Sequence, residues 1–311
     1  MMEATDKTTG KTIDKAAGKT TDKAINRQSL KQRIRSYLRH PLSLALFLLV
    51  TAAAAITVFV LVFLVLYILV KGVPYLTPSL FAWEYNSENV SLMPALINTI
   101  MMTVLALMIA APFGIFAAIY LVEYAKRGNK VVKVIRVTAE TLSGIPSIVY
   151  GLFGFLLFGV TLKWGYSLIG GALTLAIMIL PLVMRTTEEA LKSVPDSYRE
   201  GSFGLGAGRL RTVFQIVLPS AVPGILAGVI LAIGRIVGET AALMYTAGTV
   251  AGIPENFMGS GRTLAVHMYV LTNEGLYTNQ SYATAVVLLV IVVLVNALSG
   301  FIAKQIGKGK N

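Results

Sequence analysis

An apolar run of about thirty residues, positions 218–247, contains an arginine and a glutamate near its middle, Arg235 and Glu239. A helix needs about 20 apolar residues to cross the hydrocarbon core of a bilayer, so the run is long enough to span a membrane. Each ionised side chain costs about 2.5 to 3.5 kcal/mol at the membrane centre. Four residues apart on a helix, the two share one face and can form an ion pair. They indicate either a buried pair that locks two helices together or a path for a charged solute.

Other segments are equally apolar, so the chain is expected to cross the membrane several times. Hydrophobic residues make up 55% of the 311 residues, and the mean hydropathy is +0.72. Soluble domains are rarely so apolar. The expected fold is all-α, a polytopic bundle of six spanning helices in a permease domain at 41–311. The six spans are expected at 42–70, 92–122, 142–162, 167–184, 218–247 and 283–303.

The basic residues gather on one side of these spans. The net charge is +12, and the positions before the first span, the loop at 123–141, the loop at 186–217 together with Arg185 just before it, and the C-terminus hold 23 of the 27 lysines and arginines. Cytoplasmic segments carry such an excess, so both termini are expected in the cytoplasm. Residues 1–40 contain an Asp-Lys pair every eight residues and little apolar surface, which predicts a disordered basic tail. The charges form no basic face with interleaved aromatics, which argues against nucleic acid as a partner.

The residues of common catalytic and metal sites are scarce. The chain has no cysteine, and its two histidines, His40 and His267, are far apart in the sequence. Disulfides and thiol chemistry are therefore excluded, and no spacing suggests a metal site or a resident cofactor. No nucleophile with a base and no ATP-binding motif is evident, so we expect a transport subunit, not an enzyme, with ATP hydrolysis on another chain.

Three motifs resemble a known family. The sequence reads EGS at 200–202, glycine at 206 and IVLP at 216–219. It resembles the cytoplasmic loop of ABC importer permeases, Glu-Ala-Ala, three residues, Gly, nine residues, Ile-x-Leu-Pro, and departs from it only where Gly-Ser replaces two alanines. With GIPSIVYGLFG at 144–154 and GRIVGET at 234–240, the chain is similar to phosphate-specific ABC importer permeases of MetI-like fold. The order of features resembles the PstA branch more than the PstC branch, over residues 42–307.

The resemblance implies a permease that moves inorganic phosphate into the cytoplasm. It implies a related second permease (PstC-like), two copies of an ABC ATPase (PstB-like) and an extracytoplasmic phosphate-binding protein (PstS-like). It also implies that the loop docks on the ATPase through Tyr198, Arg199, Glu200, Gly206, Leu218 and Pro219. We expect this loop to form two short helices with a hinge near Gly206. The alternatives are a permease for sulfate, molybdate or phosphonate, and a nutrient-sensing membrane subunit.

The candidate substrate path comprises five residues: Arg235, Glu239, Thr240, Arg185 and Ser147. A guanidinium stays charged when desolvated and matches two oxygens of an oxyanion. Glu239 either accepts a hydrogen bond from the phosphate hydroxyl or neutralises Arg235 when the path is empty. Arg185 is either a snorkelling anchor or, by the resemblance, a transport arginine. Ser147 follows a Gly-Ile-Pro that either exposes helix amides to an anion or kinks the helix for packing.

Two further features concern the surroundings of the fifth span. Two pairs of glycines, at 224 and 228 and at 234 and 238, each have members one turn apart, which permits a close helix contact and fits a partner permease beside this span. The glycine-rich segment 249–282 is expected outside, with an interfacial helix at about 262–271 and room to receive a soluble partner.

Overall fold

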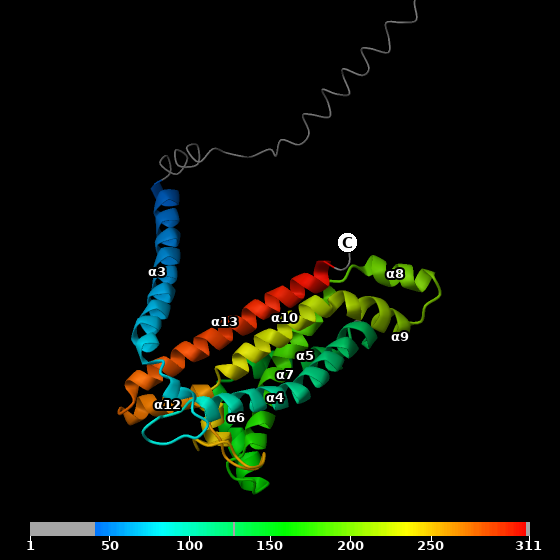
Figure 1. Ribbon diagram of the computed structural model, residues 1–311. Coiled ribbons are helices and arrows are strands. Elements are labelled where there is room, and N and C mark those ends of the chain that lie inside the picture. The colour runs from blue at the N-terminus through cyan, green and yellow to red at the C-terminus, as the bar shows by residue number, and fades with distance from the viewer. Residues whose placement is uncertain (1–40, 127, 309–311) are drawn as a thin grey trace, which may run out of the picture. The chain divides into compact units, whose positions relative to one another are not determined.

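The computed structural model describes residues 41–126 and 128–308, and all regular structure within them is helical (Figure 1). The tail predicted at residues 1–40 lies outside the described part. The chain divides into two units, Met1–Val65 and Leu66–Asn311. The described part of the first unit belongs to helix α3 (Pro41–Gly72), and its apolar side chains, Phe59 among them, are exposed. Exposed apolar surface along a helix of this length suits contact with lipid.

The second unit contains the remaining helices. After the short 3₁₀ turns η1 (Val73–Tyr75) and η2 (Pro78–Phe81) they are α4 (Met93–Ile119), α5 (Lys130–Ser143), α6 (Ser147–Gly154), α7 (Leu168–Lys192), α8 (Asp196–Gly204), α9 (Arg209–Thr212), α10 (Leu218–Val237), α11 (Ala241–Thr246), α12 (Leu264–Glu274) and α13 (Thr278–Lys308). Three π-helical segments extend or join them: η3 (Tyr120–Tyr124), η4 (Phe155–Thr161) and η5 (Val213–Val217).

Five helical segments of the described residues are long and apolar enough to span a membrane. They are Leu42–Tyr75, Met93–Tyr124, Leu168–Lys192, Arg209–Val237 and Thr278–Leu298. Helix α5 and the segment formed by α6 and η4 are bent by 100° at a short break and qualify together as a sixth span. The predicted six-span bundle is therefore confirmed when this bent pair is counted as one span.

The bend lies inside the span predicted at 142–162, and Pro146 explains it. Proline lacks a backbone N–H and disfavours helical geometry in the residue before it, so it favours a helix break at this position. Helix α5 ends at Ser143, and α6 begins directly after Pro146. The segment predicted as a loop at 123–141 is therefore largely helical, with Asn129 capping the start of α5 by accepting from Val131 N at 2.9 Å.

The fifth span also differs from the prediction of one continuous helix through residue 247. Helix α10 ends at Val237, and α11 begins at Ala241. Gly238 weakens helix continuation at this point. The side chain of Glu239 then caps the next helix, because its Oε1 accepts from Ala242 N at 3.1 Å. The two charged residues of the apolar run thus lie on opposite sides of a helix break.

The core forms where α7 packs between α4 and α10. A buried apolar cluster joins these helices to α6 and α11, with Met102, Ile179, Ala232 and Leu243 among its members. The glycines of α10 make this packing possible, since a Cβ on Gly228 would collide with the side chain of Thr186 in α7. The prediction that this part of the glycine stripe packs on a partner permease is therefore wrong, because α7 of the same chain occupies it.

Candidate substrate path and coupling surface

Arg235 lies in the last turn of α10 with an exposed side chain. Among the described residues no ion pair joins it to Glu239 or to another carboxylate. Glu239 is instead buried and caps α11. The predicted intrahelical pair is thus not formed, because the helix ends between its members. What remains is an uncompensated guanidinium at the end of a spanning helix, where the helix dipole favours positive charge.

Two other predicted path residues lie on elements next to Arg235. Ser147 is the first residue of α6, and Thr240 immediately precedes α11; both side chains are partly buried. Helices α6 and α11 approach closely, since a Cβ on Gly151 would come within 2.7 Å of Ala242 Cα. Tyr150 of α6 donates its hydroxyl to Leu142 O at 2.8 Å and lies within electrostatic range of Arg235. The GIPS and GRIVGET motifs are therefore neighbours in space.

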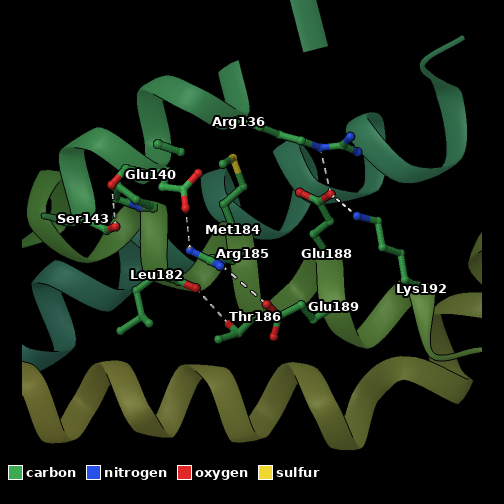
Figure 2. Close-up of a pocket in the computed structure, with 12 residues that line it drawn as sticks. Arg136, Glu140, Ser143, Leu182, Met184, Arg185, Thr186, Glu188, Glu189 and Lys192 are labelled. Atoms are coloured by element: carbon green, nitrogen blue, oxygen red, sulfur yellow. Dashed lines mark hydrogen bonds and ion pairs between the residues drawn. The ribbon is translucent and has the colours of Figure 1, made fainter. Parts of the chain in front are cut away.

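Arg185 belongs to a different place, a cavity of about 520 Å³ between α5 and α7 (Figure 2). Its Nε lies 3.5 Å from Glu189 Oε1, and its Nη1 lies 3.9 Å from Glu140 Oε1. In the same cavity, Glu188 Oε1 of α7 is contacted by Arg136 Nε of α5 at 2.9 Å and by Lys192 Nζ of α7 at 2.5 Å. The three basic side chains of this cavity are balanced by three acidic ones, so Arg185 is not a free cation in this conformation.

The two predicted path arginines are separated along the bundle. Thr186, next to Arg185, packs against Gly228 of α10. Arg235 is seven residues further along that helix, or about 10 Å at 1.5 Å per residue. The two arginines therefore lie at different levels of the helix pair formed by α7 and α10.

The coupling loop forms the expected pair of short helices. Helices α8 and α9 are joined through Gly206, whose φ of +82° is a left-handed conformation that suits glycine. Helix α8 has no buried residue. Tyr198 is 52% exposed and Leu205, just after α8, is 90% exposed, while Glu200 also faces outward. This segment presents apolar and acidic side chains that a partner can cover.

Arg199 points the other way, into the bundle. Its Nη2 lies 2.7 Å from Glu123 Oε1 and 3.0 Å from Leu191 O, and its Nη1 donates to Val194 O at 2.8 Å. The Arg199 and Glu123 side chains are 15% and 8% exposed. This side chain fastens α8 to the ends of α4 and α7 in this conformation, and its predicted role in docking stays a prediction.

The last two predicted coupling residues lie where the coupling segment meets α10. Leu218 and Pro219 begin α10 and are partly buried, and Leu218 packs on the apolar cluster that includes Leu191 and Val213. A displacement of α8 and α9 would reach α10 through this position, because η5 connects α9 directly to Leu218.

Comparison with known proteins identifies the family. Residues 110–309, more than half of the chain, match the model of the binding-protein-dependent transport system inner membrane component. The chain belongs to this permease family. It is accordingly a multi-pass inner-membrane transport component and not an enzyme, as the sequence predicted.

The permease has relatives of similar length. It is 37% identical over 238 residues to the probable ABC transporter permease protein YqgI of Bacillus subtilis, covering 72% of this chain and 81% of that protein. It is 37% identical to the phosphate transport system permease protein PstA 1 of Mycobacterium tuberculosis, covering 67% and 69%. To the PstA protein of Pasteurella multocida it is 40% identical, covering 58% and 64%.

Solved structures show the same fold at lower identity. A bacterial ABC transporter that imports the acidic polysaccharide alginate matches with a TM-score of 0.60 at 17% identity, covering 87% of the permease and 99% of that chain. An inward-facing MetNI methionine ABC transporter matches with a TM-score of 0.56 at 19% identity, covering 69% and 94%. The expected MetI-like permease fold is confirmed.

Sequence reasoning missed a buried polar cluster near the start of α12. Arg262 is 4% exposed, and its guanidinium lies over the ring of Tyr85, with Cζ 4.7 Å from the ring centroid. His267 is fully buried, and its ring meets the edge of the same tyrosine ring. The predicted interfacial helix exists as α12, but His267 within it and Arg262 just before it are buried, whereas Thr272, Asn273 and Glu274 at its end are exposed. The sequence offered one clue to this cluster, the position of Arg262 outside the predicted spans. That clue predicted a solvated side chain and not a buried one.

The buried histidine predicts a pH effect on stability. Burial, and secondly the charge of Arg262, lower the pKa of His267 to about 3 against an ordinary 6.5. The unfolded chain then binds the extra proton, so the contribution of His267 to stability is full above pH 6.5 and is lost progressively as the pH falls toward 3. Between pH 6.5 and 5 the loss is about 2 kcal/mol. We expect the fall in unfolding temperature over this range to be smaller in His267→Gln than in the parent; equal falls would contradict this assignment.

Proposed function

We propose that this permease is the membrane subunit of an ATP-driven importer that carries inorganic phosphate into the cytoplasm. The uncompensated guanidinium of Arg235 carries the proposal, because a permanently charged group at the end of a spanning helix needs an anion to offset its cost. The relatives named as PstA phosphate permeases support phosphate as that anion. Arginine suits the task, since its planar fork can bind two phosphate oxygens and stays charged when desolvated.

The proposed importer complex has four kinds of subunit. A related PstC-like permease would complete the path, two PstB-like ATPase subunits would supply energy, and a PstS-like binding protein would deliver phosphate from outside. Both termini of the permease would lie in the cytoplasm, beside a disordered tail at residues 1–40. The exposed surface around Tyr198, Glu200 and Leu205 supports the docking of an ATPase on α8. The partly buried start of α10 at Leu218 and Pro219 supports transfer of that movement to α10, which carries Arg235.

The contacts of Glu239 favour a structural role beside the path. Because its carboxylate caps α11 and does not meet Arg235, neutralising Arg235 is not its role in this conformation. We expect Glu239→Gln, which keeps an oxygen acceptor for Ala242 N, to retain uptake and the preference of phosphate over sulfate. Glu239→Ala should lower stability by about 1 kcal/mol through loss of the cap. A Glu239→Gln variant with reduced discrimination against sulfate would show instead that the carboxylate recognises the phosphate hydroxyl.

Reconstitution tests the proposal. The permease is placed in vesicles with the second permease and the ATPase, the binding protein is added outside, and accumulation of labelled phosphate is followed with and without ATP. We expect ATP-dependent accumulation that excess phosphate inhibits and excess sulfate or molybdate does not. Accumulation of sulfate, molybdate or phosphonate instead would assign another oxyanion. Absence of any transport, with phosphate-dependent control of a partner retained, would assign a sensing subunit.

A further inference from the structure

A second charged hollow lies at the end of α4 and adjoins the cavity at Arg185, with which it shares Arg136, Glu140 and Lys192 as lining residues. It has a volume of about 880 Å³ and is enclosed by η3, α5, the end of α7, α8 and the first residue of α9. Seven basic and three acidic side chains line it. The predicted substrate path and the exposed surface of α8 leave this hollow without a role.

The acidic side chains of the hollow are already engaged. Arg199 binds Glu123 at 2.7 Å and Asp196 at 3.2 Å, and Glu140 faces Arg185 at 3.9 Å. Among the basic residues, Arg199 is thereby neutralised, and Arg136 and Lys192 share Glu188 (Figure 2). What is left is an excess of positive charge inside a concave surface.

That excess comes from four side chains. Within the described part of the chain, no ion pair engages Lys126, Lys130, Lys133 or Arg209. Arg209 lies over the ring of Tyr124, with Cζ 5.6 Å from the centroid, which fixes its guanidinium at the rim. Lys130 and Lys133 are one turn apart on α5 and therefore share its hollow-facing side.

We propose that this hollow binds the phosphate group of an anion on the cytoplasmic side of the membrane. Ammonium and guanidinium groups from separate elements can contact several oxygens of one phosphate, and basic pockets between helices suit anionic lipid headgroups. The opposite face of α5 is apolar, with Val131 and Val134 each 63% exposed, so the helix is amphipathic as interfacial helices are. An anionic phospholipid and free inorganic phosphate share this chemistry, and the experiment below separates them.

An occupant of the hollow would adjoin the base of the coupling helix. Arg199 and Phe203 of α8 form part of its wall, next to the ion pair that holds α8 to Glu123. Binding would therefore hold α8 against the ends of α4 and α5. This consequence for coupling rests on the proposed function, whereas binding itself does not.

Binding is tested on the assembled membrane complex in detergent, without the soluble binding protein. Its unfolding temperature is titrated with phosphatidylglycerol, with phosphatidylcholine and with inorganic phosphate, for the parent and for Lys130→Gln/Lys133→Gln. A matched control, Lys304→Gln/Lys308→Gln, removes the same charge at the C-terminal end of α13. The Lys130→Arg/Lys133→Arg variant changes the same two positions but keeps their charge, so it shows whether substitution there misfolds the protein.

We expect phosphatidylglycerol to raise the unfolding temperature more than phosphatidylcholine, with an apparent affinity roughly thirtyfold weaker in the glutamine variant. The control and the arginine variant should match the parent. A shift by inorganic phosphate alone that the glutamine variant loses would assign the site to free phosphate and equally support it. Equal titrations of the parent and the glutamine variant would overturn the proposal, even if the complex transports phosphate. Weaker binding in a complex that does not transport phosphate would leave the site standing and the proposed function refuted.

Discussion

Replacing Arg235 by glutamine should lower ATP-driven phosphate uptake by a factor of about thirty or more, while the permease still assembles with its partners. Removing one member of a desolvated, hydrogen-bonded charge pair costs about 2 to 5 kcal/mol, and here the other member is the passing anion. The side chain is exposed and makes no ion pair within the described residues, so its loss should leave the fold intact. Arg235→Lys keeps the charge but not the fork, and we expect an intermediate rate.

The measurement is the initial rate of labelled phosphate uptake into vesicles containing the complex, normalised to assembled transporter. Arg262→Gln is not a suitable control, because Arg262 is buried. Lys163→Gln is a suitable control, since it removes an exposed charge from the turn between η4 and α7. An Arg235→Gln complex that accumulates phosphate at the parental rate would remove this residue from the path.

Breaking the buried pair between Arg199 and Glu123 should damage both stability and coupling. Arg199→Gln leaves Glu123 buried without its counter-charge, which typically costs about 3 to 5 kcal/mol. It also removes donors from Leu191 O and Val194 O, which hold α8 to the end of α7. We expect a lower unfolding temperature and ATP hydrolysis that no longer drives proportionate uptake, because α8 can then move without α10.

A double-mutant cycle separates this role from docking. Adding Glu123→Gln to Arg199→Gln removes the uncompensated charge and should recover part of the lost stability, as expected for residues in direct contact. Glu200→Gln, on the exposed side of α8, should lower uptake with little change in unfolding temperature. If Arg199→Gln instead behaves like Glu200→Gln, with stability unchanged, then Arg199 acts at the ATPase surface and the inward contact is unimportant.

Local sequence signals predicted much of the fold. Apolar length identified the spans, because lipid demands about 20 residues of helix whatever the neighbours are. The glycine at 206 identified the turn between α8 and α9, where a positive φ favours that residue. The two helix breaks at Pro146 and Gly238 were harder, since proline and glycine occur in spanning helices without always interrupting them.

The candidate site was less predictable, because its contacts join distant parts of the chain. Arg199 meets Glu123, 76 positions away, and no periodicity within the loop distinguishes an inward from an outward arginine. For Arg235 and Glu239 the sequence predicted a contact that the structure lacks. Their spacing favours an ion pair only on an unbroken helix, and the helix ends between them. Arg185 and Glu140 meet only because the chain bends by 100° between α5 and α6.

The most direct test asks whether phosphate reaches the face of α10 that carries Arg235. The chain has no cysteine, so a single one can be introduced at Leu231, which is 58% exposed and one turn before Arg235, with buried Ala232 as the control. In the assembled importer, a charged, membrane-impermeant thiol reagent should label Leu231→Cys and not Ala232→Cys. Phosphate, delivered by the binding protein with ATP, should slow the labelling, and the added Arg235→Gln should abolish that protection. Absence of labelling at 231, or protection that persists without the guanidinium, would contradict a phosphate path at Arg235.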